Sequence, residues 1–296
     1  MVYSFDELKK SDLVEKPHYL VIGNPIRHSL SPVMHQYGLD YHGINAEYHA
    51  LELYMQDLTG FVAWMNQKSF LGCNITIPYK QEFISLLDET DDSVKYTGAV
   101  NTISSSKDRI TGFNTDVEGF LKPLYEHKDI LYGNRAVVFG TGGASKAVIA
   151  GLIEMGLGEI VLVSRHPDKI TYLLPDDSDF FNEILITPCS YDQLYAYAEE
   201  AFLFVNATPL GMAPNVKTSP IEKIDPQVLD GKICYDLVYN PLETEFLKTA
   251  KSQNAVIING LDMFIAQGNR SFQIWTGQSL PHDEIYDLLT NILSDN

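Results

Sequence analysis

An apolar strand that runs directly into a cluster of glycines is the feature that most constrains the fold of this chain. Residues 135–139 read Arg-Ala-Val-Val-Phe, and Gly140-Thr141-Gly142-Gly143-Ala144-Ser145 and a helical stretch at 146–154 follow. Glycines permit a tight turn and the close approach of a ligand, while the start of a helix offers N–H groups and a positive dipole. Ser145 replaces the third glycine of the usual fingerprint. The order of strand, turn and helix predicts a site for the pyrophosphate of a dinucleotide.

The end of the next strand indicates which dinucleotide would bind. Residues 159–163 predict this strand, which ends in Ser164-Arg165-His166-Pro167-Asp168-Lys169. An NAD site usually has an acidic residue here, whereas Arg165 and Lys169 are cations that suit a 2′-phosphate. The chain has 21 Lys and Arg against 39 Asp and Glu, a net charge of −18, so a solvated surface loop explains these two cations less easily. The loop favours NADP, and Asp168 leaves NAD as the alternative.

Short apolar strands alternate with amphipathic helical stretches, which is typical of α/β architecture with largely parallel sheets. In the first part of the chain we expect strands at 18–22, 47–53, 72–77, 99–104 and 109–113, and helices at 31–41, 55–66 and 79–87. A polar turn at 105–108 would join the last two of these strands. In the second part we expect strands at 135–139, 159–163, 184–186, 202–206, 233–237 and 256–258. Two helices separated by residues 277–281 would end the chain. A boundary near residue 117 would divide two α/β units.

Composition and charge exclude several classes of protein. A length of 296 residues with 45% apolar residues predicts a globular protein of roughly two domains. A net charge of −18 repels nucleic acid and anionic membrane surfaces, and neither an export signal nor a membrane-spanning apolar segment is found. Cys73, Cys189 and Cys234 form no CxxC pair, and the histidines include no HExxH motif. We expect a cytoplasmic protein with no metal and with neither a nucleic acid nor a membrane partner.

Polar residues gather at the ends of the expected strands of the first unit, where open α/β sheets usually bind ligands. They lie in Ser29-Leu30-Ser31, Asn74 to Lys80, Ala99 to Thr102 and Gly112 to Asp116. Hydroxyls and amides suit a polyhydroxylated carboxylic acid, and a lysine with an aspartate suits proton transfer. Each segment also has a purely structural explanation. Ser29 and Ser31 could cap the helix at Pro32, Asn114 to Asp116 could form an Asx turn and a cap, and Asn101 could lie in a turn.

Taken in order, these segments make the sequence similar to the shikimate dehydrogenase family over nearly the whole chain, from about Tyr19 to Trp275. The matching segments are Gly23 to Ile26, His28 to Pro32, Asn74 to Lys80, Gly98 to Thr102, Gly112, Asn114 to Asp116, the glycine turn, Asn206 to Met212, Tyr235-Asp236, Tyr239 to Pro241 and Gly260 to Gln267. Together, in this order and spacing, they are highly specific. The departures are Thr141 for the commoner alanine, Leu237 for the commoner methionine, and Lys169 where arginine is frequent. These departures bear on the details of cofactor binding and do not involve Lys80 or Asp116.

The resemblance implies an enzyme that reversibly reduces 3-dehydroshikimate to shikimate with NADP, in the shikimate pathway of aromatic amino acid biosynthesis. It assigns residues 1–116 and 260–296 to a substrate-binding catalytic domain and residues 117–259 to a Rossmann-type NADP-binding domain. Lys80 and Asp116 would be the catalytic pair, with Lys80 as the proton donor. The substrate would contact Ser29, Ser31, Thr76, Lys80, Asn101, Asp116, Tyr239 and Gln267. The cofactor would contact Gly140, Thr141, Gly142, Gly143, Ala144, Ser164, Arg165, His166, Lys169, Leu237, Gly260 and Asp92.

Two alternatives stay open at this point. A quinate/shikimate dehydrogenase of the same family would use NAD and accept quinate, although Tyr239 and the serines at 29 and 31 favour shikimate, as Arg165 and Lys169 favour NADP. A non-catalytic member of the family could instead sense a ligand. Such a sensor has no need of an acid-base pair, so Lys80 and Asp116 argue against it. We expect either a monomer or a homodimer.

Overall fold

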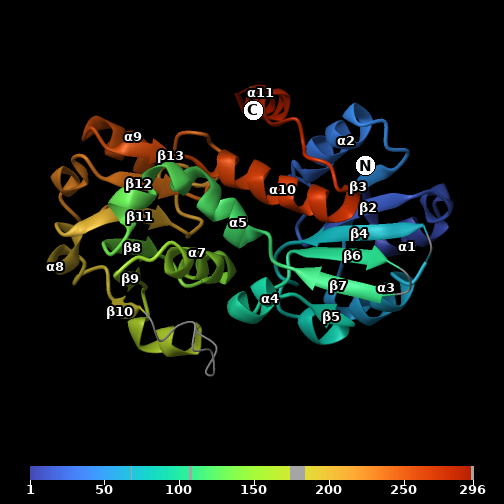
Figure 1. Cartoon of the computed structure of the whole chain (residues 1–296), viewed down its shortest axis with the longest axis horizontal. Coiled ribbons are helices and arrows are strands. Elements are labelled where there is room, and N and C mark those ends of the chain that lie inside the picture. The colour runs from blue at the N-terminus through green and yellow to red at the C-terminus, as the bar shows by residue number, and fades with distance from the viewer. Residues whose placement is uncertain (68, 107–108, 174–183, 295–296) are drawn as a thin grey trace. The chain divides into compact units, whose positions relative to one another are not determined.

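The computed structural model describes residues 1–67, 69–106, 109–173 and 184–294, and it divides into two compact units. Unit 1 comprises Met1–Thr115 and Gln267–Leu289, and unit 2 comprises Asp116–Ala266 and Thr290–Asn296. Each unit contains its own sheet with helices packed against it (Figure 1). The assignment of substrate to one domain and cofactor to the other stays a prediction.

Unit 1 is built on a seven-stranded sheet of order β1-β3-β2-β4-β6-β7-β5. Its strands are β1 (Val2–Ser4), β2 (His18–Gly23), β3 (Glu47–Glu52), β4 (Phe70–Ile75), β5 (Glu89–Thr90), β6 (Thr102–Ser106) and β7 (Arg109–Phe113). All neighbours run parallel except that β6 is antiparallel to both β4 and β7. The carboxyl ends of β2, β3 and β4 therefore share one edge of the sheet.

Helices cover both faces of this sheet. Leu8 of α1 (Phe5–Lys10) and Phe61 of α3 (Leu58–Trp64) join an apolar core with Leu20 of β2. On the opposite face, His35 of α2 (Ser31–Tyr41) stacks on Tyr48 of β3, with ring centroids 4.5 Å apart. The other elements of unit 1 are η1 (Asp12–Glu15), η2 (Met55–Asp57), η3 (Ile84–Leu86) and α4 (Asp92–Thr97). Unit 1 also includes the last part of α10 (Gly260–Thr276) and the first part of α11 (His282–Ser294).

Unit 2 contains a six-stranded, wholly parallel sheet of order β10-β9-β8-β11-β12-β13. Its strands are β8 (Arg135–Phe139), β9 (Glu159–Val163), β10 (Leu185–Cys189), β11 (Ala201–Asn206), β12 (Ile233–Asp236) and β13 (Val256–Ile258). The chain runs outward from β8 to β10 and then returns to start again at β11, so the strand order reverses between β8 and β11. Ligands of open α/β sheets bind at such a reversal.

The two faces of this sheet follow from the alternation of side chains along each strand. Ala136 and Val138 pack in a core with residues of α5 (Asp116–Leu121) and α7 (Gly143–Glu154). Val137 and Phe139 pack in a second core with residues of α8 (Tyr195–Ala198) and α9 (Glu245–Ser252). The remaining elements are η4 (Lys122–His127), α6 (Lys128–Leu131), η5 (Pro167–Leu173) and η7 (Pro226–Leu229).

The predicted α/β class with largely parallel sheets is confirmed, while several predicted elements differ. The helix expected at 79–87 is wrong, because residues 79–83 form turns and only Ile84–Leu86 is a short 3-10 helix. The backbone of this turn bonds to a distant segment instead, because the Val100 N–H donates to the Lys80 carbonyl at 2.7 Å. Helix α7 begins at Gly143, earlier than expected. Lys107 and Asp108 of the polar turn lie outside the described residues.

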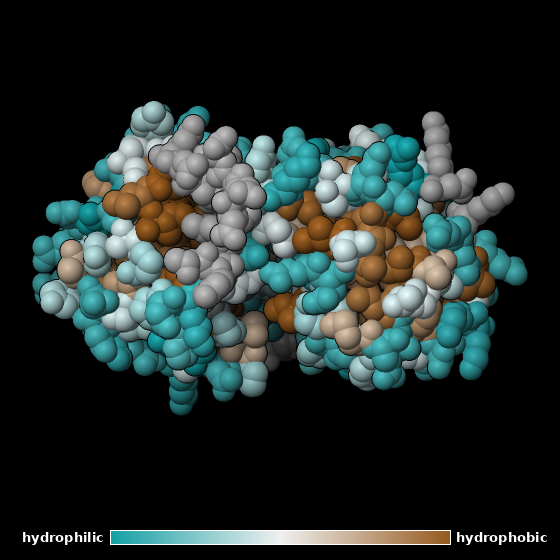
Figure 2. All heavy atoms as spheres, turned by 90° about the horizontal axis from the view of Figure 1, so that it is seen from below, coloured by the Kyte–Doolittle hydropathy of each residue, from teal (hydrophilic) through white to brown (hydrophobic). Residues whose placement is uncertain are grey.

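The surface is mostly polar on the face drawn in Figure 2, where apolar side chains form separate patches among hydrophilic ones. Within the described ranges, no helix is both long enough and apolar enough to cross a membrane.

Candidate functional site

Two loops meet at the carboxyl edge of the unit 1 sheet because a glycine lets them approach. A Cβ added at Gly23, the last residue of β2, would lie 2.5 Å from Cγ2 of Thr76 and 3.3 Å from the Ile77 carbonyl. The Asn24 N–H donates to the Ile77 carbonyl at 3.1 Å, and the Thr76 N–H donates to the Ile22 carbonyl at 2.9 Å. The half-buried Thr76 is thus held where β2 and β4 both end.

Ser29 and Ser31 lie at the start of α2, but neither caps it through its side chain. The N-cap residue is Leu30, and Ser31 is already inside the helix, so neither serine is the N-cap residue. The Ser31 N–H donates to the Ser29 hydroxyl oxygen at 3.3 Å, which places these two residues together. Ser29 is half-buried and Ser31 is buried. Both serines stay candidates for binding a carboxylate.

Lys80 is half-buried in the turn that follows β4. The hydrogen bond between its carbonyl and the Val100 N–H joins this turn to the segment that carries Asn101. The structure therefore places Thr76, Lys80 and Asn101 on neighbouring segments of unit 1, since the Ile75 N–H also donates to the Asn101 carbonyl at 2.8 Å. A hydroxyl, an ammonium and an amide on neighbouring segments are groups that can orient the alcohols of a small polar ligand and transfer a proton.

Asn101 does not lie in an isolated turn, since its side chain holds the backbone that leads into Asp116. The Thr115 N–H donates to Asn101 Oδ1 at 2.8 Å, and Asn101 Nδ2 donates to Thr115 Oγ1 at 3.0 Å. Asn114 is held separately, because its Nδ2 donates to Thr97 Oγ1 at 2.8 Å. Asp116 is buried as the first residue of α5. These bonds fix the position from which the Asp116 carboxylate projects.

The glycine turn of unit 2 has the geometry that a phosphate site needs. Gly140 has φ +102°, and an added Cβ would lie 2.8 Å from Cγ2 of Thr208. By contrast, a Cβ on Gly142 or Gly143 would meet no atom within 4 Å, and both residues are exposed. Helix α7 begins at Gly143 without a side-chain cap, and it has 12 residues. Within the described residues, no side chain therefore competes with an anionic ligand for the N–H groups of Gly143 and Ala144, whereas the Ser145 N–H already donates to the Gly142 carbonyl at 3.1 Å.

Ser145, the residue that replaces the third glycine, stabilises the turn from its buried side. Ser145 is fully buried, and its hydroxyl donates to the Gly140 carbonyl at 2.8 Å. Thr141 and Ala144, the other residues of the turn, are half-buried. The serine therefore closes the turn internally and leaves the glycine surface for a ligand.

The loop after β9 presents its cations to solvent. Arg165, His166 and Lys169 are exposed, and the buried Ser164 accepts a bond from the His166 N–H at 3.1 Å. The Lys169 N–H donates to the His166 carbonyl at 3.1 Å, which folds the loop back on itself. These residues follow β9, the strand next to β8, and could hold a phosphate that extends from the glycine turn.

Leu237 and Gly260 pack their backbones against one another in unit 2. A Cβ on Gly260 would collide with the carbonyl group of Leu237, and the Gly260 N–H donates to the Val238 carbonyl at 3.2 Å. Nearby in sequence, Tyr239 packs its ring on Phe264 at 4.9 Å. Burial raises the pKa of Tyr239, so its phenol stays a hydrogen-bond donor at neutral pH.

Asp236 is a buried carboxylate that the site prediction omitted although it lies in a segment that matches the family. It accepts hydrogen bonds from Thr244 Oγ1 at 2.6 Å, Asn206 Nδ2 at 2.9 Å and the Val238 N–H at 3.0 Å. Burial raises its pKa to about 6, against the opposing effect of these bonds. The three donors fix the loop that contains Leu237.

Asp92, one of the expected cofactor contacts, forms an ion pair with Lys95 at 2.7 Å on the exposed surface of α4 in unit 1. The helix carries Asp91 as its N-cap, so Asp92 is not needed for capping. Nothing in its surroundings points to a ligand.

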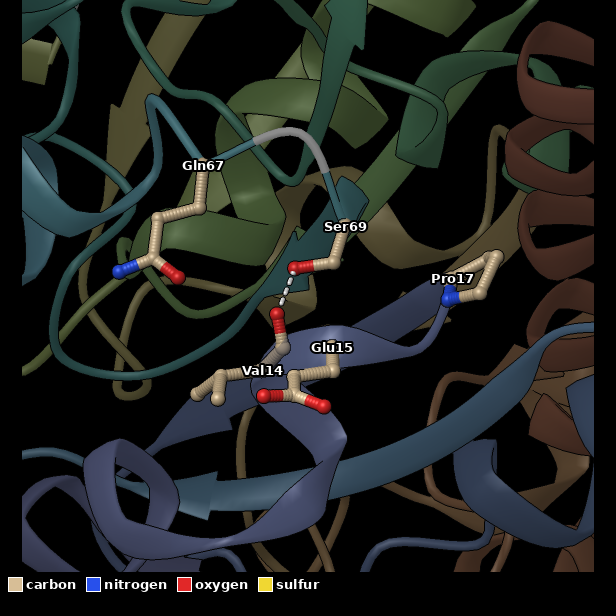
Figure 3. A pocket seen from close by; sticks show the side chains of 5 residues that line it. All are labelled: Val14, Glu15, Pro17, Gln67 and Ser69. Atoms are coloured by element: carbon tan, nitrogen blue, oxygen red, sulfur yellow. Dashed lines mark hydrogen bonds between the residues drawn. The ribbon is translucent and has the colours of Figure 1, made fainter.

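A cavity of about 330 Å³ in unit 1 lies away from these residues. It is lined by Val14, Glu15, Pro17, Gln67 and Ser69, and Figure 3 shows the Ser69 hydroxyl turned to the Val14 carbonyl. Pro17 and Ser69 precede β2 and β4, so the cavity is at the amino ends of the strands. Among the residues that the structure describes, no group of three or more His, Cys, Asp or Glu could hold a metal ion.

Two segments of the chain match known families. Residues 21–103 match the family described as "Shikimate dehydrogenase substrate binding domain", and residues 260–290 match "Shikimate 5'-dehydrogenase C-terminal domain". The chain is 37% identical over 278 residues to the shikimate dehydrogenase (NADP(+)) of Synechocystis sp., covering 92% of this chain and 94% of that protein. It is 38% identical to the enzyme of the same name from Moorella thermoacetica over 88% of each chain.

Solved structures agree in fold. Shikimate 5-dehydrogenase from Thermus thermophilus, solved in complex with NADP(H) and shikimate, superposes with a TM-score of 0.79 at 33% identity, covering 94% of this chain and 99% of that one. The enzyme from Listeria monocytogenes, in complex with shikimate and NAD, has a TM-score of 0.82 at 28% identity, covering 93% and 96%.

Proposed function

Because the chain belongs to the shikimate dehydrogenase family, we propose that it is an NADP-dependent oxidoreductase that interconverts 3-dehydroshikimate and shikimate. The observation that carries this proposal is the joint presence of an ordered Thr76, Lys80 and Asn101 cluster in unit 1 and an open glycine turn in unit 2. The first has the polar groups for a hydroxylated acid, and the second has the N–H groups for a dinucleotide.

The residues of unit 2 fit NADP on structural grounds. The added Cβ atoms of Gly142 and Gly143 would point into open space, so a pyrophosphate has room to approach the start of α7. Arg165 and Lys169 are exposed cations that can pair with a 2′-phosphate. Leu237 and Gly260 would contact the nicotinamide end, and Asp236 would hold the Leu237 loop in place. The bound cofactor would supply the hydride, and the protein must supply the proton.

Ser29 and Ser31 would bind the substrate carboxylate, and the family resemblance adds Tyr239 as a further substrate contact. Thr76, Asn101, Asp116 and Gln267 would bind the ring hydroxyls. Lys80 would donate the proton to the carbonyl oxygen during reduction and take it back during oxidation, while Asp116 orients the ammonium. The backbone bond from Val100 to Lys80 supports this role because it fixes the turn from which the ammonium projects.

An assay of four combinations tests the proposal. Purified protein is given shikimate or quinate with NADP or NAD, and formation of the reduced nicotinamide is followed by its absorbance. We expect the highest kcat/KM with shikimate and NADP. A preference for quinate or NAD would identify the other enzyme of the family, and no turnover in any combination would support a ligand sensor.

We further propose that the protein is cytoplasmic and is a monomer or a homodimer. The three buried, unpaired cysteines are consistent with a reducing compartment. Light scattering coupled to size-exclusion chromatography would distinguish the two oligomeric states, and a tetramer or larger assembly would contradict the proposal.

A further inference from the structure

The hydroxyl of Ser271 is the meeting point of a buried polar network in unit 1. Ser271 is fully buried on α10, and its Oγ lies 2.9 Å from Asn74 Nδ2, 2.8 Å from Thr102 Oγ1 and 3.2 Å from Thr115 Oγ1. The same oxygen lies 3.0 Å from the carbonyl of Gln267, one helical turn earlier. One hydroxyl therefore joins a helix, two strands and the segment before Asp116.

The direction of the network is fixed at one end by Tyr48. Its hydroxyl donates to Asn74 Oδ1 at 2.7 Å, and burial raises the Tyr48 pKa well above its usual value, so this group stays a donor. Asn74 must then turn its Nδ2 toward Ser271 and Thr102, where it donates at 2.9 and 3.1 Å. Ser271 thus accepts from Asn74, and its own proton is available for the Gln267 carbonyl.

A second polar bond anchors the next turn of the same helix. Trp275 Nε1 donates to the Ile103 carbonyl of β6 at 2.9 Å, and the Trp275 ring stacks on Tyr19 of β2 at 4.8 Å. Gly72 of β4 leaves room for this indole, because an added Cβ would lie 2.6 Å from Trp275 Nε1. Trp275 therefore holds this part of α10 on the sheet at one point. Ser271 adds a polar attachment one turn closer to Gln267.

We propose that Ser271 is a positioning residue for substrate binding, which holds Gln267 in register with the carboxyl end of β4 and the amino end of β6. This inference rests on the proposed function, because Gln267 is the residue expected to contact a ring hydroxyl. Ser271 itself is too deeply buried to touch substrate, so it acts only through the residues that it holds. Its removal should weaken shikimate binding and leave NADP binding unchanged.

The test compares Ser271→Ala with the wild-type enzyme. Loss of one buried hydrogen-bond hub should raise the KM for shikimate by about tenfold while kcat changes by less than about threefold. The KM for NADP should stay within about twofold. Calorimetric titration with shikimate alone should show the same weakening. Thr276→Val is the matched control, because Thr276 makes the same bond to the carbonyl four residues earlier, to Phe272 at 2.7 Å on the same helix, and should leave these values unchanged.

A double-mutant cycle separates positioning from general packing. If Ser271 acts through Gln267, adding Ser271→Ala to a Gln267→Ala protein should raise the shikimate KM by no more than about twofold further. An undiminished tenfold effect in that background would overturn the proposal, as would a single variant with a normal shikimate KM. Ser271→Cys keeps the volume and should give a smaller rise than alanine; a larger one would also count against the hydroxyl. A wild-type protein without turnover would instead refute the proposed function itself.

Discussion

Among single residues, Arg165 is the one on which cofactor choice should depend most. It is exposed after β9, where a 2′-phosphate would lie. Arg165→Ala should raise the KM for NADP by about tenfold, because a charge-assisted bond to phosphate is lost. The KM for NAD should not change. Arg109→Ala is a suitable control, since Arg109 is also exposed but pairs with Glu89 at 2.6 Å in unit 1. An unchanged ratio of the two KM values would remove Arg165 from the cofactor site.

Asp236 should make stability depend on pH in a defined direction. Burial raises its pKa from 3.8 to about 6, so the folded state holds the proton more tightly than the unfolded state. This contribution to stability is complete below pH 4 and is lost as the pH rises through about 6. Asp236→Asn cannot titrate. As the pH rises from 4 to 7, the wild type should lose up to about 3 kcal/mol of unfolding free energy that the variant does not lose. The difference, variant minus wild type, should therefore increase by that amount.

Urea unfolding of both proteins at several pH values measures this difference. Two curves that stay parallel across the range would show that Asp236 has an ordinary pKa in the folded protein.

At the scale of elements, the glycine turn allows two similar substitutions with opposite expected effects. Gly140→Ala forces alanine into φ +102° and against Thr208, which should destabilise the protein by about 1–3 kcal/mol. Gly143→Ala places its methyl group in open space at the first position of α7, so the free energy of unfolding should hardly change.

NADP binding should be weakened more by Gly143→Ala than by Gly140→Ala, the reverse of the order expected for stability. The methyl group of Gly143→Ala would lie where the pyrophosphate approaches, and should raise the KM for NADP by about tenfold or more. Thermal unfolding and steady-state kinetics on both variants give the two readouts. If Gly143→Ala binds NADP normally, the open surface of the turn is not the phosphate site.

Elements that are specified by local sequence could be predicted, and those that depend on distant contacts could not. The strand at 135–139 and its glycine turn follow from neighbouring residues, and the structure contains both. The helix expected at 79–87 is wrong because the bond that fixes the turn at 79–83 joins Lys80 to Val100, a residue 20 positions away in the sequence. The polar network around Ser271 could not be predicted for the same reason. Asn74 and Ser271 are 197 positions apart, and no local sequence pattern links them.

At the scale of the whole molecule, the division of labour between the units can be tested by hydrogen exchange with one ligand at a time. Shikimate alone should slow exchange in residues 74–80 and 99–102 of unit 1, and NADP alone should slow it in residues 140–146 and 164–169 of unit 2. Each ligand stabilises the segment that it contacts. Protection of the same unit by both ligands would contradict the assignment of the two domains.

The most direct test of the central claim is the rate of reduced nicotinamide formation from saturating shikimate and NADP by Lys80→Ala. A positioned acid-base group typically contributes about 10² to 10⁴ in rate, so kcat should fall by that factor while the KM for shikimate changes little. Lys248→Ala removes an exposed lysine that pairs with Glu245 at 2.8 Å, and it should keep the wild-type rate. A Lys80→Ala enzyme that turns over at close to the wild-type rate would show that the proton comes from elsewhere.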